Sequence, residues 1–319
     1  FTPLQYTRLN LDDFVDKRDE FTGDEWLDLL IQSIGFNPAK FERRVKLLML
    51  LRLVPFVESN YNLIELGPRE TGKTYTFRNT SNRAFVVSGG KATPATLFYN
   101  KASRKLGVIG LKHVVFFDEI ANTNFDDAEA SISVLKDYMQ TGKFSRGDQE
   151  FSAPCSVVLG GNIDTNLELK QPEEGYKHLF AVLPQELQDP AFLDRIHGYL
   201  PGWEMPKIRP ENYATGYGLL TDYMAEIFAE LRRRNFQTHV NAWVDFGNMT
   251  GRNQDAIKKT AAGLLKLLYP HRSPDTLASD EIHPLMELAV EMRQRVTDQL
   301  AKILPTEFSN VQYGFKLTR

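Results

Sequence analysis

Residues 67–74 read Gly67-Pro68-Arg69-Glu70-Thr71-Gly72-Lys73-Thr74, which matches the phosphate-loop pattern G-x-x-x-x-G-K-[ST] in full. The apolar run at 63–66 leads directly into this loop, as a strand would. Glycines let backbone N–H groups curl around phosphate oxygens, Lys73 adds a positive charge, and the Thr74 hydroxyl can ligate Mg²⁺. The alternative is a chance Gly-Lys-Thr in a turn, which the preceding strand disfavours. The stretch therefore predicts a nucleotide site with Mg²⁺ at the start of a helix.

The composition is that of an ordinary globular protein. Of 319 residues, 42% are hydrophobic and 25% are charged, and the length suggests about two domains. The net charge of -3 excludes a broadly basic surface, so any contact with nucleic acid has to come from a local patch or a lined channel. The single cysteine, Cys155, has no partner for an internal disulfide and lies beside an apolar run, which predicts a buried thiol.

We expect the protein in the cytoplasm, without contact to a membrane. No stretch approaches the ~18 uninterrupted apolar residues of a membrane helix, and no signal peptide opens the chain. The chain begins at Phe1 without a methionine, so we expect it to be a piece of a longer polypeptide. Part of the function would then reside outside it.

Short β-rich runs alternate with helical patterns in the first two-thirds of the chain. Apolar residues at helical spacing predict two packed helices between residues 23 and 53, and further helices at 94–105 and 126–139. The β-rich runs lie at 62–66, 84–87, 113–117, 156–159 and 196–200. This alternation predicts an α/β fold in which a mostly parallel five-stranded sheet lies between helical layers.

Strand signals fade after residue 203, and long helical patterns follow at 218–234, 253–268 and 280–304. We therefore divide the chain into an N-terminal helical segment (1–60), a phosphate-loop α/β domain (61–208) and an all-helical lid domain (209–319). The tail at 311–317 has strand character but no local neighbour to pair with. We expect it to lead into a further domain.

Two acids follow the third predicted strand. The apolar run at 114–117 is followed by Asp118 and Glu119. Because the carboxyl end of a parallel strand lies beside the phosphate loop, we expect Asp118 to hold Mg²⁺ and Glu119 to orient and deprotonate the attacking water. The alternative is a solvated turn, which the phosphate loop upstream makes the weaker interpretation.

Two further candidates flank the later strands. Asn162 closes the fourth strand, where its amide would reach the γ-phosphate or the water; a simple Asn-containing turn is the alternative. Arg195 ends a helix just before the fifth strand, and from there it would reach the phosphates of a neighbouring subunit in a ring. The alternative for Arg195 is an ion pair with Asp194 or Asp189.

One basic residue of the predicted lid is a candidate for contact with the nucleotide. Arg252 opens a helix and would close over the bound nucleotide, which would couple nucleotide binding to the angle between domains. Lys258 on the same helix is the second choice. The alternative is that these cations lie on a solvated helix face.

Together these elements resemble an AAA+ ATPase, with Walker A at 67–74, Walker B at 114–119, sensor 1 at Asn162, the arginine finger at Arg195 and sensor 2 at Arg252. More narrowly, the chain resembles the Lon-related ATPases of bacterial BREX phage-defence systems in the stretches Glu65–Arg69, Ser88–Gly90, Leu97–Asn100, Lys136–Met139, Phe144–Gly147, Pro201–Glu204 and Gly263–Pro270. The resemblance implies ATP hydrolysis with Mg²⁺ in a hexameric ring, single or stacked, that engages DNA and other defence proteins. It also implies a Lon-protease-like domain after this core.

The chain departs from the pattern of these relatives at two points. Glu70 stands where AAA+ phosphate loops usually have glycine, which brings a carboxylate near the phosphates and weakens nucleotide binding unless the side chain points away or pairs with Arg69. Nothing in the chain resembles a Lon Ser-Lys dyad, so we expect no peptidase activity.

The sequence leaves two possibilities for the polymer on which such a ring acts, DNA and protein. Protein unfoldases carry an aromatic loop after the second strand, but the corresponding stretch at 88–93 contains no aromatic residue. By contrast, a predicted hairpin at 141–147 would present Lys143 and Arg146 to the centre of the ring. An ordinary surface hairpin is its alternative. A DNA-binding or translocating motor is the leading hypothesis, and a protein-remodelling ATPase and a nucleotide-gated scaffold are the others.

Overall fold

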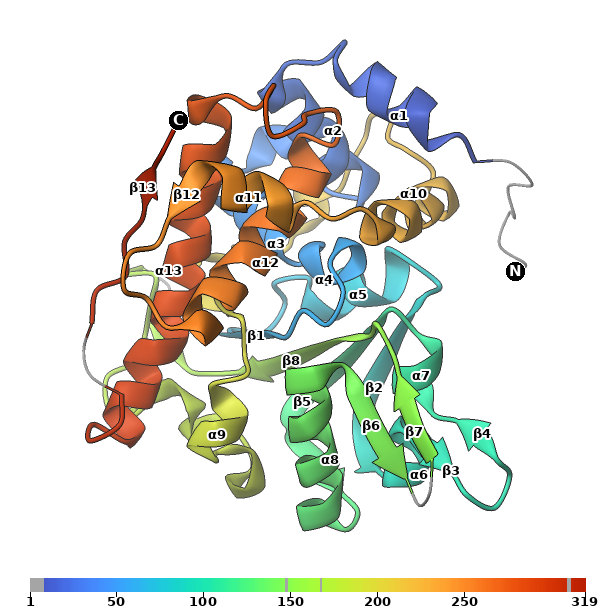
Figure 1. Cartoon of the computed structure of the whole chain (residues 1–319), viewed down its shortest axis with the longest axis vertical. Helices are drawn as coiled ribbons and strands as arrows, with labels where there is room; N and C mark the ends of the chain where they lie inside the picture. Colours follow the sequence, from blue (N-terminus) through green and yellow to red (C-terminus); the bar gives the residue numbers. More distant parts are fainter. Residues whose placement is uncertain (1–8, 147–148, 167, 309–310) are drawn as a thin grey trace.

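A sheet of five parallel strands forms the centre of the computed structural model, which describes residues 9–146, 149–166, 168–308 and 311–319 (Figure 1). The strand order is β11-β1-β8-β5-β2. The bounds are β1 Leu63–Gly67, β2 Ala84–Ala92, β5 Val114–Phe125, β8 Ser156–Asn162 and β11 Gly198–Pro201. Each strand contains or overlaps a predicted β-rich run, so the predicted parallel sheet is confirmed.

Both faces of the sheet are buried, which explains the nearly continuous apolar character of its strands. Along β1, Leu63 packs into one core and Ile64 into the other. Along β5, Phe116 packs into the first core and Phe117 into the second. Hydrophobic side chains therefore connect the sheet to a helical layer on each face, and the predicted three-layer α/β arrangement is confirmed.

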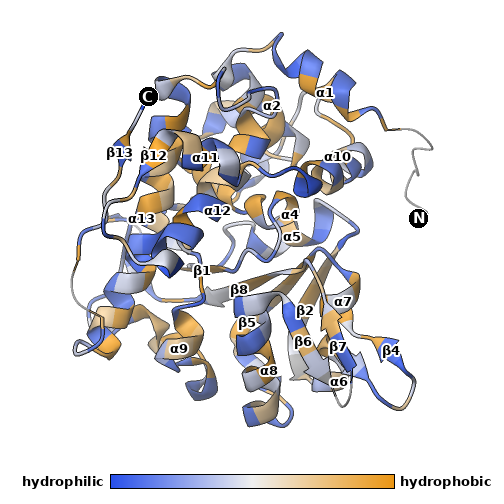
Figure 2. Cartoon of the chain, viewed as in Figure 1, coloured by the Kyte–Doolittle hydropathy of each residue, from blue (hydrophilic) through white to orange (hydrophobic). Residues whose placement is uncertain are grey.

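Helices from both ends of the chain form one of these layers (Figures 1 and 2). Helices α12 and α4 approach closely at Gly263, where an added Cβ would lie 2.4 Å from Cγ1 of Val54. The indole N–H of Trp26 donates to the carbonyl of Leu267 at 2.8 Å. The layer contains α1 Leu11–Arg18, α2 Gly23–Ser33, η1 Pro38–Lys40, α3 Arg43–Leu51, α4 Val54–Val57, α10 Thr221–Arg233, α11 Gln237–Trp243, α12 Gly251–Leu268 and α13 Ser279–Ile303. The domain boundaries near 60 and 208 stay a prediction, because the two helical regions share this core.

The opposite layer combines short helices with two hairpins. It contains α6 Pro94–Leu97, α7 Val108–Leu111, α8 Ala128–Thr141, η2 Leu179–Val182, η3 Gln185–Leu187 and α9 Pro190–Leu193. The first hairpin pairs β3 Tyr99–Asn100 with β4 Lys105–Leu106, and the second pairs β6 Lys143–Arg146 with β7 Gln149–Ser152. The predicted helix at 126–139 is confirmed, whereas the predicted helix at 94–105 ends at Leu97.

The hairpin replaces that helix because of local turn chemistry. The side-chain oxygen of Asn100 accepts hydrogen bonds from the backbone N–H groups of Ala102 and Ser103, both at 3.0 Å. Such bonds offer the backbone an alternative to the helix. Arg104 then adopts a positive φ of 54°, which no helix accommodates.

Two more segments test the sequence-based expectations. Strands β2 and β5 continue past Asp118 after a bulge, so the stretch at 88–93 belongs to the sheet as far as Ala92. The tail contains β13 Lys316–Leu317, which pairs antiparallel with β12 Val244–Asp245. The tail thus has no neighbour nearby in the sequence, as expected, and pairs instead with a strand about 70 residues earlier in the chain.

The remaining short elements are β9 Thr165–Asn166, β10 Gln171–Pro172, η4 Gly202–Glu204 and η5 Pro210–Asn212. Cys155 is buried, as predicted. Across the described ranges, the structure contains no helix with the length and apolar character needed to cross a membrane.

Candidate nucleotide site

The phosphate loop connects β1 to helix α5, Lys73–Asn79. Gly72 caps the helix with a φ of +78°, a left-handed conformation in which glycine avoids steric strain. At the other end of the loop, a Cβ on Gly67 would lie 2.3 Å from the carbonyl carbon of Gly202. The two motif glycines are therefore required by backbone geometry before any nucleotide is considered.

The structure brings together the residues predicted to bind phosphate and Mg²⁺. Lys73 Nζ is buried and donates to the carbonyl oxygens of Pro68 at 2.8 Å and Gly67 at 3.3 Å. Burial, partly countered by the charge of Glu65, lowers the pKa of the Lys73 ammonium. The Lys73 charge is thus held against the loop by weak partners that an anionic phosphate would replace.

Thr74 and Asp118 are the residues that fit Mg²⁺. Thr74 Oγ1 donates to Asp118 Oδ2 at 2.7 Å, although 44 residues separate them in the sequence. Hydroxyl and carboxylate oxygens are ligands that Mg²⁺ accepts, usually with waters and substrate phosphates completing the shell. The described residues include no cluster of three or more His, Cys, Asp or Glu suited to a metal.

Glu119 and Asn162 lie at the same edge of the sheet as the loop. Asn162 is in register with Gly67 across the β8–β1 pair. Glu119 is exposed and has a φ of +50°, and the amide of Asn122 donates to its Oε2 at 3.4 Å. A glutamate in this backbone region costs on the order of 1–3 kcal/mol, and such strain is concentrated at functional sites. The sequence predicted the position of Glu119 but not its conformation.

The side chain of Glu70 pairs with Lys207 and not with Arg69, the partner considered from the sequence. Its backbone adopts a φ of +68°, its side chain is 72% exposed, and its Oε2 lies 3.7 Å from Nζ of Lys207. The carbonyl of Glu70 accepts from the N–H of Ile208 at 2.8 Å. The segment after the sheet therefore fixes the backbone of Glu70 and partly compensates its charge, while Arg69 is exposed.

A buried ion pair beneath the loop was missed by the sequence analysis. Arg52 donates to both carboxylate oxygens of Glu65, at 2.9 and 2.6 Å, and both side chains are 0% exposed. Arg52 also donates a hydrogen bond to the carbonyl oxygen of Thr71, in the phosphate loop, at 2.9 Å. The end of α3 thus holds the loop from below. The available signal was the lone acid in an apolar strand, because a buried carboxylate requires a partner.

Arg195 lies at the opposite edge of the sheet. Asn62, just before β1, donates to the carbonyl of Arg195 at 3.0 Å, which places Arg195 where β1 begins and not where it enters the loop. The guanidinium of Arg195 donates to the carbonyl of Ala191, and its buried Nε has no partner in the described ranges. Burial and the charge of Arg252 lower the pKa of Arg195.

The alternative of an ion pair for Arg195 is not supported. Asp189 pairs with Lys136 at 3.2 Å. Asp194 pairs with Arg293 at 2.5 Å and also with Arg252. Among described residues, neither acid forms an ion pair with Arg195.

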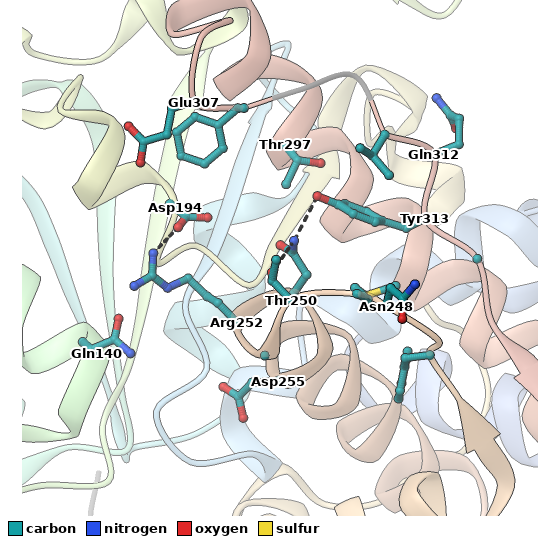
Figure 3. A pocket seen from close by; sticks show the side chains of 17 residues that line it. Gln140, Asp194, Asn248, Thr250, Arg252, Asp255, Thr297, Glu307, Gln312 and Tyr313 are labelled. Carbon is teal, nitrogen blue, oxygen red and sulfur yellow. Dashed lines mark hydrogen bonds and ion pairs between the residues drawn. The ribbon is translucent and has the colours of Figure 1, made fainter.

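Arg252 lies at this same edge, so the predicted closure over the nucleotide of its own chain is not formed. Helix α12 begins at Gly251 beside Asp194, at the far end of β1 from the phosphate loop, and Arg252 reaches this aspartate. Lys258, the second choice, lies over the ring of Phe246 at 5.4 Å. A cavity of about 890 Å³ opens beside Arg252, between the start of α12 and the tail (Figure 3).

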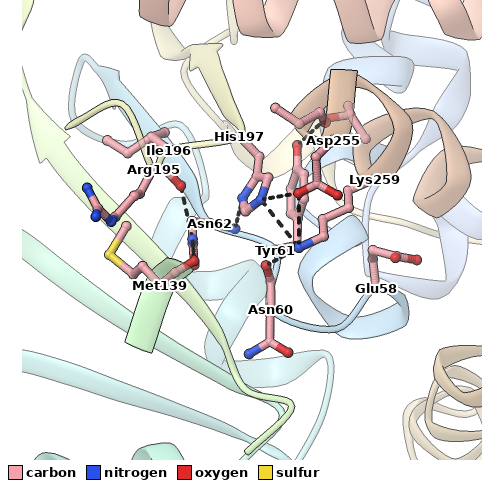
Figure 4. Close-up of polar contacts among 12 residues, drawn as sticks. Glu58, Asn60, Tyr61, Asn62, Met139, Arg195, Ile196, His197, Asp255 and Lys259 are labelled. Carbon is pink, nitrogen blue, oxygen red and sulfur yellow. Dashed lines mark hydrogen bonds and ion pairs between the residues drawn. The ribbon is translucent and has the colours of Figure 1, made fainter. Parts of the chain in front are cut away.

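A network of polar side chains connects this edge to β1 (Figure 4). The backbone N–H of Asn62 donates to His197 Nδ1 at 2.8 Å, so the proton of the neutral ring lies on Nε2. Nε2 faces Asp255 Oδ2 at 3.7 Å and Lys259 Nζ at 3.5 Å. Burial and the charge of Lys259 lower the pKa of His197 to about 4. Burial alone would raise the pKa of Asp255, but its contacts with His197 and Lys259 lower it to about 2.

The predicted cationic hairpin is present as β6 and β7. Lys143 Nζ lies 2.9 Å from Glu150 Oε1 on the facing strand, so its charge is paired. The backbone of Arg146 belongs to β6, while its side chain and residues 147–148 lie outside what the structure describes. The hairpin is confirmed, and its contact with DNA stays a prediction.

Comparisons with known proteins identify the family of the chain. Residues 1–314 match the family model described as "Lon-like protease BrxL-like, ATPase domain". The chain is 40% identical over 314 residues to Lon-like protease BrxL of Escherichia coli O9:H4 (strain HS), covering 98% of this chain and 44% of that protein. It is 41% identical over 316 residues to Lon-like protease BrxL of Bacillus cereus (strain H3081.97), covering 98% and 46%. The chain thus spans less than half the length of these relatives, and it belongs to the family of BrxL-like ATPase domains.

Proposed function

We propose that this chain is the ATP-hydrolysing core of a cytoplasmic ring, of hexameric size and single or stacked, that engages DNA and other proteins in defence against phage. The observation that carries the proposal is the separation of the machinery between two edges of one sheet. The phosphate loop, Asp118 and Glu119 lie at one edge, while Arg195 lies at the other and forms no ion pair with any described residue. Such a division suits a site completed by a second copy of the chain.

The proposed reaction is hydrolysis of the γ-phosphate by water. Lys73 leaves its carbonyl partners and binds phosphate oxygens, and Glu119 accepts the proton from the attacking water. The water oxygen bonds to the γ-phosphorus, and the bond to the bridging oxygen breaks to release ADP. Thr74 and Asp118 would hold Mg²⁺, which supplies charge to balance the phosphates. Asn162 orients the water.

The neighbouring copy contributes positive charge in this scheme. Arg195 reaches the transferred phosphate from the adjacent subunit and stabilises its developing negative charge. Arg252 lies beside it on the same edge, so we propose that Arg252 also binds phosphates of the neighbouring site, after it leaves Asp194. This assignment replaces a contact within one chain by a contact between chains.

The test of the enzyme proposal is ATP turnover with Mg²⁺. Glu119→Gln should reduce turnover by roughly 10²–10⁴-fold, because the general base is lost while the phosphate loop is intact. Binding of a fluorescent ATP analogue should be preserved in this variant. Glu174→Gln, at an exposed position, is the matched control and should match the wild type. Background turnover in both the wild type and Glu119→Gln would leave the nucleotide-gated scaffold as the better account.

DNA is favoured over protein as the polymer by one feature of the sheet. The stretch at 88–93, where an unfoldase would carry an aromatic loop, has no aromatic residue and is paired with β5 as far as Ala92. We therefore expect DNA to stimulate ATP turnover more than an unfolded polypeptide does. The reverse order would favour the protein-remodelling alternative.

A further inference from the structure

The basic residues of the chain are unevenly distributed. Residues 71–117 contain eight basic side chains and no aspartate or glutamate. The rest of the chain has 30 basic and 41 acidic residues, so the net charge of -3 conceals a strongly positive segment. Such local concentration of one sign is the usual electrostatic mark of a site for polyanions.

Several of the eight basic residues already have partners. Lys73 belongs to the phosphate loop, and Arg83 binds both carboxylate oxygens of Glu226 at 2.8 Å. Arg78 and Lys112 donate to a serine hydroxyl and a backbone carbonyl, at 3.1 and 2.9 Å. By contrast, three exposed cations form no ion pair with any described residue: Lys101, Arg104 and Lys105. All three lie in the hairpin formed by β3, β4 and the turn between them (residues 99–106), which we call the basic hairpin.

The basic hairpin is held in place by packing at its base. The ring of Tyr99 lies 4.9 Å from that of Phe151, and the ring of Phe98 lies 5.3 Å from that of Phe144. The hydrogen bonds of Asn100 and the positive φ of Arg104 fix the turn. The basic hairpin therefore lies beside the β6–β7 hairpin, and Figure 1 shows both at the same end of the molecule. Its cations are presented by a defined structure.

The two hairpins differ in their available charge. In the β6–β7 hairpin, Lys143 is paired with Glu150 on the facing strand at 2.9 Å. A phosphate that approaches Lys143 therefore competes with a carboxylate already in contact. A phosphate that approaches Lys101, Arg104 or Lys105 displaces only water, so its binding keeps the full Coulomb and counterion-release gain.

We propose that the basic hairpin binds the phosphate backbone of DNA through Lys101, Arg104 and Lys105. The inference rests on the proposed engagement of DNA and assigns it to residues that the motif-based prediction did not include. A lipid surface fits less well, because the turn carries Ala102 and Ser103 between its cations, whereas a membrane-binding turn needs exposed aromatic or large apolar side chains. Because the proposed contacts run to phosphates, we expect binding by the basic hairpin to depend little on DNA sequence.

The test compares salt-dependent DNA binding by the whole chain and by Lys101→Gln/Arg104→Gln/Lys105→Gln. The probes are a fluorescein-labelled duplex and its separated strand, measured by anisotropy over a range of salt concentrations. If all three cations contact phosphates, the slope of log K against log salt should fall by about 2–3, and binding near physiological salt should weaken at least ~10-fold. Lys101→Arg/Arg104→Lys/Lys105→Arg keeps the charges and should retain binding.

Two controls separate this inference from folding and from net charge. The three substituted side chains are exposed, so the thermal midpoint of the glutamine variant should match the wild type. Lys40→Gln/Lys177→Gln/Lys302→Gln removes the same charge from exposed positions outside the basic hairpin and should leave the slope nearly unchanged. An equal loss in both triple variants would overturn the hairpin assignment, as would an unchanged slope in the first. A wild-type chain that binds neither probe would contradict the proposed engagement of DNA as well.

Discussion

The two edges of the central sheet are built in different ways. At the edge where the strands end, a contiguous motif forms the phosphate loop, and Thr74 contacts Asp118. At the edge where the strands begin, single residues from distant segments meet: Arg195 before β11, Arg252 and Asp255 at the start of α12, and His197. The first edge is organised by the backbone and the second by side-chain networks.

This difference indicates how one fold can divide a reaction between copies. A loop that surrounds phosphates needs backbone N–H groups, and these come from consecutive residues. A contribution to a neighbouring site needs a cation on a supported surface, which a network can provide. Asp194 shows this support, because Arg293 is buried, binds its carboxylate at 2.5 Å and also donates to its carbonyl at 3.1 Å.

Loss of the arginine at the second edge should have the largest effect. Arg195→Ala is expected to reduce ATP turnover by about 10³-fold or more, because transition-state charge is left unbalanced. Nucleotide affinity should change little, since the phosphate loop is intact. Arg319→Ala, a substitution at the exposed end of the chain, is the control in the same turnover assay. Near-normal turnover of Arg195→Ala would remove the second edge from the reaction.

The buried ion pair between Arg52 and Glu65, beneath the phosphate loop, should contribute strongly to the stability of the folded chain. Arg52→Met leaves Glu65 buried without a partner, so the free energy of unfolding should fall by about 3–5 kcal/mol in urea titrations. Arg52→Met/Glu65→Leu removes both charges and should be considerably more stable than the single variant. The double variant should still bind nucleotide more weakly than the wild type, because the contact with the carbonyl of Thr71 is lost. If the single and double variants are equally stable, the ion pair does not support the loop in this way.

Acid should destabilise the second edge. The pKa of His197 is about 4 in the folded chain because of burial, whereas it lies near 6.5 in an unfolded chain. The unfolded chain therefore binds a proton between these values that the folded chain does not. This histidine should lower the free energy of unfolding by about 2.5 kcal/mol as the pH falls from 6.5 to 4. His197→Asn keeps an acceptor for Asn62 and should flatten the pH dependence in urea titrations, whereas exposed His283→Asn should not.

The smallest expected effect concerns the acid within the loop. Glu70→Gly removes a carboxylate near the phosphates and relieves a positive φ, so ATP affinity should increase by about 2–10-fold in a fluorescent-nucleotide titration. Glu70→Gln separates the two causes, because it removes only the charge. Unchanged affinity in both variants would mean that Lys207 already compensates Glu70 completely.

Sequence alone was sufficient where the chemistry is local. The phosphate loop, the two acids that follow the apolar run of β5 and the five strands are each encoded by consecutive residues. The strand signals survive because both faces of the sheet are buried. Local turn chemistry was also decisive where the prediction failed. Asn100 forms a turn where the helix at 94–105 was predicted to continue, and its side-chain hydrogen bonds are difficult to foresee from apolar periodicity.

Sequence alone was insufficient where the partners are distant. Nothing in the order of residues indicates that Arg52 meets Glu65, that His197 meets Asp255, or that the tail pairs with β12. Arg252 was misplaced for the same reason, since its position depends on how α12 packs against the sheet. Long-range packing decides each of these contacts.

Mixing two inactive variants tests most directly whether the two edges act between copies. Arg195→Ala keeps Glu119 and lacks the arginine, whereas Glu119→Gln keeps the arginine and lacks the base. In an equimolar mixture allowed to exchange subunits, roughly a quarter of the interfaces would combine an intact Glu119 with an intact Arg195 from the neighbour. We expect ATP turnover to recover to about that fraction of wild type. A mixture no more active than its separate components would contradict the account.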